Sequence, residues 1–319
     1  MKKMIILSLL CSLAGFSALA QPIDDLVVRN AEGDLVFFPF RDGSFDDGKR
    51  VGNGWDFTHY LVGNWTGDGN DDLIVRNELG ELLLYPFRDG TFYEHNGGQV
   101  VGHGFNYTHY FVGDWTGDGT DDLIVRNQAG DLLLYPFRNG TFYGHNGGRR
   151  VGNGWDFTHY FVGKWAGNGT DDLIVRNQAG DLLLYPFVNN TFYDQGNGIR
   201  VGNGWNFTHY FVGEWTGNGT PDLVVRTAAG ELLLYPFDRG TFYEQNGGTV
   251  VGHGWDFTHY FVGNWTNNGT DDLVVRNAAG EMLLYPFHNN SFYDQGGGRI
   301  VARDWNYTHY LLGGWLRNE

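Results

Sequence analysis

Residues 151–200 read VGNGWDFTHYFVGKWAGNGTDDLIVRNQAGDLLLYPFVNNTFYDQGNGIR, and this stretch decides the fold. When it is shifted by fifty residues toward either end of the chain, it matches again at most positions. The tripeptide Thr-His-Tyr recurs in the same way, beginning at Thr58, Thr108, Thr158, Thr208, Thr258 and Thr308. Self-similarity at a fixed period of this length is typical of solenoids, propellers and other repeat architectures.

Each repeat contains four short candidates for β-strands, separated by turns rich in Gly, Asn and Asp. In the repeat quoted above they are THYFVG at 158–163, DLIVRN at 172–177 and DLLLYPF at 181–187, with a weaker fourth strand such as 148–152. Branched, leucine and aromatic residues dominate these segments, and no stretch shows a helical period. A four-stranded unit of this length is typical of one blade of a β-propeller.

The two ends of the chain predict how the ring closes. The first strand-like segment, 25–30, is of the second type, and the last, 308–313, is of the first type. Each strand type is then present six times only if the last strand completes the first blade. The sequence therefore predicts an all-β, six-bladed propeller with four antiparallel strands per blade, in which the N- and C-termini complete one blade and hide an edge.

The N-terminus predicts the compartment. Lys2 and Lys3 precede an apolar run at 4–20 that ends in Ala18-Leu19-Ala20, the pattern of a secretory signal peptide cleaved near Ala20. The alternative, a membrane anchor, needs a longer apolar run. We expect residues 21–319 to form a single secreted domain, extracellular or periplasmic. The only cysteine, Cys11, lies in the signal, so the mature chain has no disulfide.

The net charge of the chain limits the kinds of partner that we expect. Removal of residues 1–20 takes away two lysines and no acidic residue, which moves the net charge from −16 to −18. Such an acidic surface repels phosphate backbones and anionic lipid headgroups, so we expect no nucleic-acid partner and no membrane insertion. Neutral glycans, cations and basic proteins remain as partners.

A resemblance to known repeats adds to this interpretation. Residues 111–125, FVGDWTGDGTDDLIV, resemble the FG-GAP/VCBS repeat of integrin α-subunit propellers. The wider pattern of Gly-Trp, a histidine four residues later, a strand and Thr-Gly-Asp-Gly resembles the Psathyrella velutina lectin-like family, and this likeness covers all six repeats. The resemblance implies a lectin that binds N-acetylglucosamine-like sugars of extracellular glycoconjugates in pockets between blades. The mushroom lectin has seven blades, so its pocket geometry need not carry over.

The same repeat contains a calcium-type loop. Oxygen ligands at alternate positions of a tight glycine-containing loop suit Ca²⁺, which takes six to eight oxygens. The copy with the most carboxylates comprises Asp114, Thr116, Asp118, Thr120 and Asp122, and the next contains Asp68 and Asp72. We predict Ca²⁺ as a cofactor of one or two of these loops. The alternative is that they are Asn/Asp/Gly turns whose side chains bond their own backbone, which we favour for the other copies.

Sugar-binding candidates gather on the opposite face, where one blade connects to the next. An aromatic ring covers the apolar face of a pyranose, and planar polar groups bond its hydroxyls. The candidate aromatic residues are Trp55, Phe105, Trp155, Trp205, Trp255 and Trp305. The candidate polar residues are Asn53, Asn153 and Asn203 (with His103 and His253 at the equivalent positions), His59, His109, His159, His209, His259 and His309, and Arg29, Arg76, Arg126, Arg176, Arg226 and Arg276.

Several alternatives remain open for these residues. Because they recur in every blade, the Trp could be a wedge between blades, and the His and Arg could belong to an internal hydrogen-bond network. At the level of function, a multivalent lectin competes with an integrin-like protein-binding propeller. An enzyme needs one asymmetric cluster of acid and base, and near-perfect repetition offers none, so we do not expect catalysis.

Overall fold

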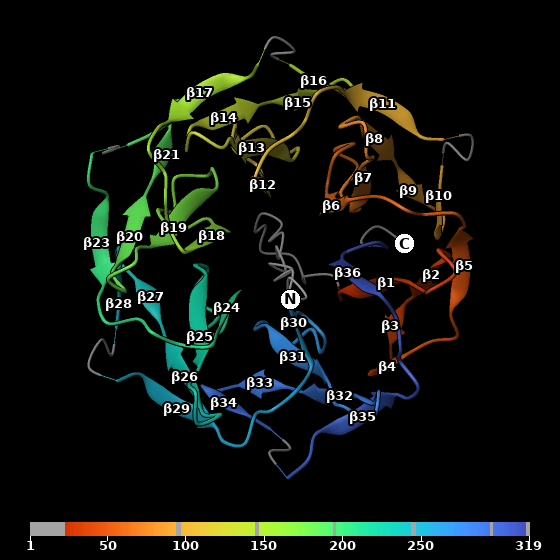
Figure 1. The fold of residues 1–319 in the computed structure, drawn as a ribbon. Helices are drawn as coiled ribbons and strands as arrows, with labels where there is room; N and C mark the ends of the chain where they lie inside the picture. Colours follow the sequence, from red (N-terminus) through yellow and green to blue (C-terminus); the bar gives the residue numbers. More distant parts are fainter. Residues whose placement is uncertain are drawn as a thin grey trace, which may run out of the picture.

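The computed structural model describes residues 23–93, 97–143, 147–193, 196–243, 247–293 and 296–316. They form a ring of six four-stranded antiparallel sheets around a central axis (Figure 1), as predicted. The predicted signal peptide at 1–20 lies outside the described residues. In the part of the chain that is described, no helix could cross a membrane.

The blades are numbered here in chain order, and each is given from its inner to its outer strand. Blade 1 comprises β36 (His309–Gly313), β1 (Asp25–Arg29), β2 (Leu35–Phe38) and β5 (Lys49–Gly52). Blade 2 comprises β6 (His59–Gly63), β7 (Asp72–Arg76), β8 (Leu82–Tyr85) and β11 (Gln99–Gly102). Blade 3 comprises β12 (His109–Gly113), β13 (Asp122–Arg126), β14 (Leu132–Tyr135) and β17 (Arg149–Gly152).

The other three blades repeat this order. Blade 4 comprises β18 (His159–Gly163), β19 (Asp172–Arg176), β20 (Leu182–Tyr185) and β23 (Ile199–Gly202). Blade 5 comprises β24 (His209–Gly213), β25 (Asp222–Arg226), β26 (Leu232–Tyr235) and β29 (Thr249–Gly252). Blade 6 comprises β30 (His259–Gly263), β31 (Asp272–Arg276), β32 (Met282–Tyr285) and β35 (Arg299–Ala302).

The two ends of the described chain close the ring as predicted. Strand β36 pairs antiparallel with β1, in a register that runs from Asp25 opposite Gly313 to Arg29 opposite His309. The innermost strand of blade 1 therefore comes from the C-terminal end of the chain, and its other three strands come from the N-terminal end. Opening the ring would expose the edge of β1, which is why closure protects the sheet.

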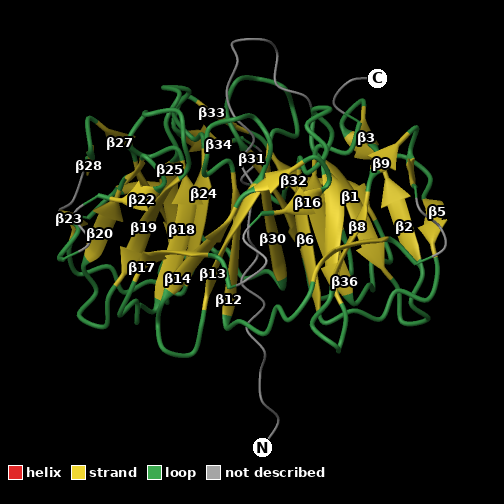
Figure 2. Ribbon diagram, turned by 90° about the horizontal axis from the view of Figure 1, so that it is seen from above, coloured by secondary structure: helices red, strands yellow, loops and turns green. Residues whose placement is uncertain are grey.

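The third strand is shorter than the predicted run at 181–187, because its ladder stops before the proline of Tyr-Pro-Phe, or of Phe38-Pro39-Phe40 in blade 1. Proline has no backbone N–H to donate, so the ladder stops there. The chain then forms a two-stranded hairpin at the rim, seen at one side of the ring in Figure 2. These hairpins are β3 (Phe40–Arg41) with β4 (Ser44–Phe45), β9 (Phe87–Arg88) with β10 (Thr91–Phe92), β15 (Phe137–Arg138) with β16 (Thr141–Phe142), β21 (Phe187–Val188) with β22 (Thr191–Phe192), β27 (Phe237–Asp238) with β28 (Thr241–Phe242), and β33 (Phe287–His288) with β34 (Ser291–Phe292).

The hydrophobic core is divided into six clusters, each lying between two neighbouring blades. Trp115 of blade 3, for example, meets Phe187 and Phe192 of blade 4 with 5.5 and 6.0 Å between ring centroids. The tryptophans at this position are all 0–2% exposed: Trp65, Trp115, Trp165, Trp215, Trp265 and Trp315. Because each blade buries its apolar face only against its neighbours, the closed ring is needed to complete the core.

Candidate functional site

The ring has two faces with different chemistry. The connector face carries the links from each outer strand to the next inner strand, such as 153–158. The loop face carries the calcium-type loops, such as 114–121, and the short hairpins. The sequence predicts sugar on the connector face and calcium on the loop face.

The connector aromatic residues do not present an open ring. Trp55, Phe105, Trp155, Trp205, Trp255 and Trp305 are only 2–5% exposed. Trp155 packs on Tyr185 and Phe192 of blade 4, at 4.5 and 4.9 Å between ring centroids. Its indole also fills the space beside Gly152, where an added Cβ would lie 2.3 Å from Nε1. The position matches the wedge between blades, so the expectation that these rings form exposed sugar platforms is wrong in geometry.

The six predicted arginines tie the connectors to the strands. Arg126 donates from Nε to the backbone oxygen of Trp155, and from Nη1 to Thr108 Oγ1 at 3.1 Å. The same two hydrogen bonds recur at Arg29, Arg76, Arg176, Arg226 and Arg276. Because these hydrogen bonds recur in every blade, the arginines form an internal network that holds the connectors in place. Their guanidinium groups are not free to bind a ligand from solvent.

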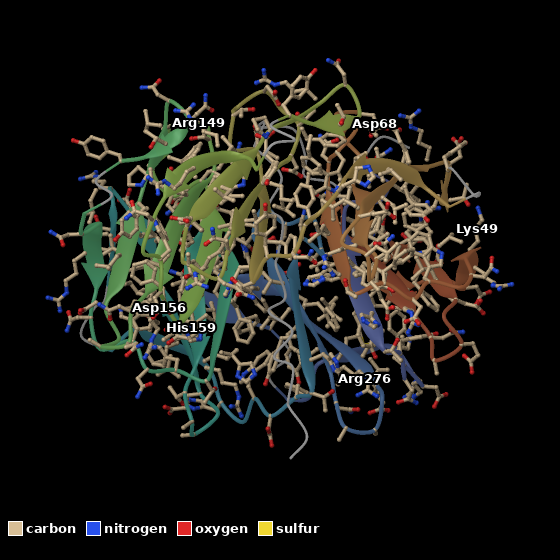
Figure 3. The ribbon with its side chains drawn as sticks, turned by 45° about the horizontal axis from the view of Figure 1, so that its top comes forward. Lys49, Asp68, Arg149, Asp156, His159 and Arg276 are labelled. Carbon is tan, nitrogen blue, oxygen red and sulfur yellow. The ribbon has the colours of Figure 1, made fainter. Side chains whose placement is uncertain are left out.

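The predicted histidines form a ring around one end of the inner strands, where Figure 3 labels His159. The imidazole of His159 lies 4.8 Å from the ring of Tyr210 in the next blade, and its Nδ1 lies 3.0 Å from Thr158 Oγ1. That hydroxyl gives its only hydrogen to the backbone oxygen of Arg176 and accepts from Arg176 Nη1. Nδ1 must therefore carry the proton and donate. Burial, and then the arginine, lower the pKa of His159, which favours the neutral form.

The remaining connector candidates point away from this network. Asn53, Asn153 and Asn203 are exposed. At the equivalent positions, His103 Nδ1 lies 3.4 Å from Glu81 Oε1, and His253 Nδ1 lies 3.5 Å from Glu231 Oε1. The structure thus brings Trp, Arg and His together inside each connector and leaves the Asn outside, so the predicted set does not converge on one pocket.

The calcium-type loop of blade 3 brings its predicted ligands together. The oxygens of its aspartates already accept hydrogen bonds, whereas Thr116 Oγ1 is buried without a hydrogen-bond partner in the part of the chain that the structure describes. Asp122 accepts from the backbone N–H groups of Phe137 and Thr116, both at 2.8 Å. Asp114 Oδ1 accepts from the N–H of Asp118 at 3.0 Å, and Asp118 Oδ1 accepts from Thr120. Among the described residues, no group of three or more His, Cys, Asp or Glu side chains is arranged to hold a metal ion. The donor set fits a cation poorly.

The loop of blade 2 repeats this arrangement, and Figure 3 labels its Asp68. Asp72 accepts from the N–H groups of Phe87 and Thr66, at 2.9 and 2.8 Å. Asp68 Oδ1 accepts from the N–H of Asn70 at 3.0 Å. Here too the carboxylates hold the backbone of the loop and hairpin in place.

A pocket that the sequence did not predict lies on the loop face, between blades 2 and 3. Its volume is about 460 Å³, and its lining is Trp65 and Thr66 of blade 2 with Asp118, Thr120, Arg138, Asn139 and Gly140 of blade 3. Arg138 Nε donates to Asp118 Oδ2 at 2.9 Å, so a donor and an acceptor stand side by side in the wall. Burial raises the pKa of Asp118, but hydrogen bonds from Thr120 and Arg138 outweigh it and hold that pKa below its usual value.

The other gaps between blades differ at these positions. Between blades 3 and 4, Asn168 and Val188 replace Asp118 and Arg138, and between blades 4 and 5 the replacements are Asn218 and Asp238. Between blades 1 and 2 the Asp68–Arg88 ion pair is kept, but Leu316 replaces Thr66. The sequence signal that could have found the pocket was this departure from the repeat at a turn position.

Comparisons with known proteins find one family and several solved structures. The FG-GAP-like repeat family matches residues 64–125. A protein of unknown function from Bacteroides caccae is similar at 11% identity and a TM-score of 0.44, over 88% of this chain and 93% of that one. BBS1N, solved in complex with ARL6DN, is similar at 13% identity and a TM-score of 0.42, over 92% and 99%. The chain therefore contains an FG-GAP-like repeat within a six-bladed β-propeller.

A third similar structure is the V. cholerae biofilm matrix protein Bap1, at 14% identity and a TM-score of 0.31, over 75% of this chain and 41% of that chain. No curated protein matches the chain. At these identities and scores the structural likenesses carry no argument about function.

Proposed function

We propose that the protein is a secreted carbohydrate-binding propeller whose principal site is the pocket between blades 2 and 3. The observation that carries the proposal is that pocket: a hollow of about 460 Å³ with charged and amide side chains in its wall. Ligand sites are concave and hold a few convergent polar groups, and this hollow has both properties.

The wall chemistry favours a neutral, hydroxyl-rich ligand. Asp118 accepts hydrogen bonds, Arg138 donates them, and Asn139 and Thr120 can do both. The carboxylate and the guanidinium neutralise each other at 2.9 Å, so the wall does not select for a charged ligand. Trp65 is 1% exposed and closes the floor, without an open face for stacking.

The resemblance to the Psathyrella velutina lectin-like family chooses the first ligands to test, which are N-acetylglucosamine and related N-acetylated sugars. The net charge of −18 that follows removal of the signal peptide supports neutral glycans over nucleic acid or anionic lipid. The same predicted signal peptide supports an extracellular or periplasmic location, where glycoconjugates are available as ligands. In this proposal the protein binds glycans and does not convert them.

A panel of immobilised glycans followed by calorimetry tests the proposal. Arg138→Ala should weaken binding of the best glycan about tenfold, because a charge-assisted hydrogen bond to the ligand is lost and Asp118 loses its partner. Arg88→Ala is the matched control, since Arg88 occupies the equivalent turn of blade 2 and pairs with Asp68 at 3.2 Å.

Two results would count against the proposal in different ways. Equal affinities for wild type and Arg138→Ala would place the sugar elsewhere on the ring. If the wild type binds no glycan at all, the lectin function is rejected, and the alternative function of a protein-binding, adhesive propeller is favoured. One observation favours that second function: a row of tyrosines after the short hairpins is 40–66% exposed, comprising Tyr93, Tyr143, Tyr193, Tyr243 and Tyr293.

A further inference from the structure

The calcium-type loop of blade 3 lies within reach of two basic side chains. Arg138, in the hairpin of the same blade, donates from Nε to Asp118 Oδ2 at 2.9 Å. Lys164, at the start of the equivalent loop of blade 4, places Nζ 3.9 Å from Asp114 Oδ2 and donates to the backbone oxygen of Gly169 at 3.2 Å. The two carboxylates that a cation would need are thus each beside a positive charge from the chain itself.

Arg138 and Lys164 change the net charge around the loop. Asp114, Asp118 and Asp122 carry three formal negative charges, and Arg138 and Lys164 carry two positive ones. The affinity of a loop for Ca²⁺ depends on the charge of its ligands, so a loop with a net charge near −1 is a poor site. The Lys164 side chain is 23% exposed and the Asp114 side chain 16% exposed, so water screens their interaction only in part.

The repeats supply an internal comparison. Five blades carry the loop, and its middle acidic position holds Asp only in blades 2 and 3, as Asp68 and Asp118. Those are also the two of the five that place an arginine at the facing hairpin position, Arg88 and Arg138. Blades 4, 5 and 6 have Asn at the loop position, and Val188, Asp238 and His288 face it. Among the five loops, an arginine is therefore present at the hairpin position only where an aspartate is present at the middle loop position.

The last carboxylate of the loop has a separate task. Asp122 Oδ1 holds the N–H of Phe137, just after the proline that ends β14. The equivalent bond from Phe40 to Asp25, at 2.8 Å, is present in blade 1, where β1 is not preceded by a loop of the type at 114–121 in the described residues. Because this hydrogen bond from the Asp carboxylate to the Phe N–H forms without the loop, it stabilises the blade itself and requires no metal.

We infer that in blades 2 and 3 the chain's own cations, Arg88, Arg138 and Lys164, take the place that calcium holds in loops of this type. The loops are then ordered by internal ion pairs and backbone hydrogen bonds, and the mature protein folds and works without calcium. This inference concerns the loops alone and stands or falls independently of the proposed sugar site.

The experiment measures the melting temperature of full-length mature protein in EDTA and in millimolar CaCl₂, with MgCl₂ at equal ionic strength as reference. The wild type should show no calcium-specific shift. The variant Arg138→Met with Lys164→Met uncovers Asp118 and Asp114, and its melting temperature should rise by about 3 °C or more in calcium, as expected for a ligand of the folded state. The single variant Arg138→Met should show a smaller rise, because the Arg138 side chain is 53% exposed and Lys164 is kept.

The matched control is Arg150→Met with Arg200→Met, which removes two positive charges from the same two blades. These arginines pair with Asp131 and Asp181, at 3.6 and 2.9 Å, and do not contact the loop. The control should stay unresponsive to calcium. A calcium-specific shift in the wild type would overturn the inference, and so would folded loop variants, single and double, that behave like the control.

Discussion

The two faces of the ring are built from the same repeat, yet they have diverged differently. On the connector face, the arginine donates to the connector oxygen and to threonine in all six blades, and a histidine lies 3.0 Å from that threonine in each. On the loop face, the charged positions change from gap to gap, and the Asp118–Arg138 pair with its pocket stands between blades 2 and 3.

This difference between the faces distinguishes residues that maintain the ring from residues that are candidates for ligand binding. A ring closes only if every gap between blades subtends nearly the same angle, so residues that set the gap must recur in each blade. Trp155, Arg126 and His159 belong to that class. A ligand needs only one gap with suitable chemistry, so residues such as Arg138 and Asp118 are free to differ. In this propeller, repetition indicates the scaffold, and departure from the repeat indicates the candidate site.

The largest effect should come from breaking a connector. Trp155→Ala removes a side chain that is 2% exposed and packed between blades 3 and 4. We expect it to lower the free energy of unfolding by about 3–5 kcal/mol, the usual cost of truncating a buried aromatic residue. Urea denaturation followed by intrinsic fluorescence measures this loss.

The chain provides its own control for that variant. Phe105 occupies the same place in the preceding connector and is 4% exposed. Trp155→Phe should therefore cost clearly less than Trp155→Ala, because the repeat already holds a phenylalanine at this position. A Trp155→Ala protein as stable as the wild type, but with one sugar site fewer, would return the sugar to the connector face.

The second prediction concerns the ends of the inner strands that lie on the loop face. There, buried carboxyl groups accept hydrogen bonds from the backbone of the neighbouring blade. Asp121 and Asp171 accept from the N–H groups of Asn64 and Asp114 of the preceding blade, both at 2.7 Å. Burial raises the pKa of Asp171 to about 7. A pKa that is higher in the folded than in the unfolded state means that the folded protein keeps a proton the unfolded chain has lost. The resulting stability is complete below about pH 4 and is lost as pH rises toward 7.

Asp171→Asn should remove that dependence. The free energy of unfolding of the wild type, relative to the variant, should fall by about 1.4 kcal/mol per pH unit between roughly pH 4 and pH 7 and level off above it. Urea titrations at half-unit intervals measure the difference. Parallel pH profiles for the two proteins would show that Asp171 does not titrate in this window.

Much of the fold could be predicted from the sequence, because it depends on patterns that the repeat multiplies. The six-bladed count followed from Thr-His-Tyr at six positions, and closure followed from the strand types at 25–30 and 308–313. The six four-stranded sheets confirm the count, and the register of β1 with β36 confirms the closure. Pro136 marks the end of the third strand, and β14 ends just before it at Tyr135, but the sequence did not predict the short hairpin that follows.

The candidate site was harder to predict, for a physical reason. Residue type alone does not distinguish a tryptophan that stacks on a sugar from one that fills a gap between blades. Trp155 became a wedge because Gly152 leaves room for its indole and Tyr185 covers it. The pocket depends on residues from two blades that are far apart in sequence, such as Trp65 and Arg138. The repeat pattern does not report such distances.

The smallest predicted effect sharpens the comparison on the loop face alone. Thr120 Oγ1 donates to Asp118 Oδ1 at 2.5 Å and lies in the wall of the pocket. Its counterpart in blade 4, Thr170, lies beside Val188 in place of an arginine, and its Oγ1 is 2.7 Å from the backbone oxygen of Phe187 and 3.0 Å from Asn168 Oδ1. Thr120→Val and Thr170→Val should each lower the free energy of unfolding by about 1 kcal/mol, because each loses one hydrogen bond. Only Thr120→Val should weaken the best glycan, by about fivefold, since only that hydroxyl orients the Asp118–Arg138 pair. Calorimetry on the two variants decides the matter: equal losses of affinity would mean that the effect is carried by the fold, and no loss in either would leave the pocket without a role in binding.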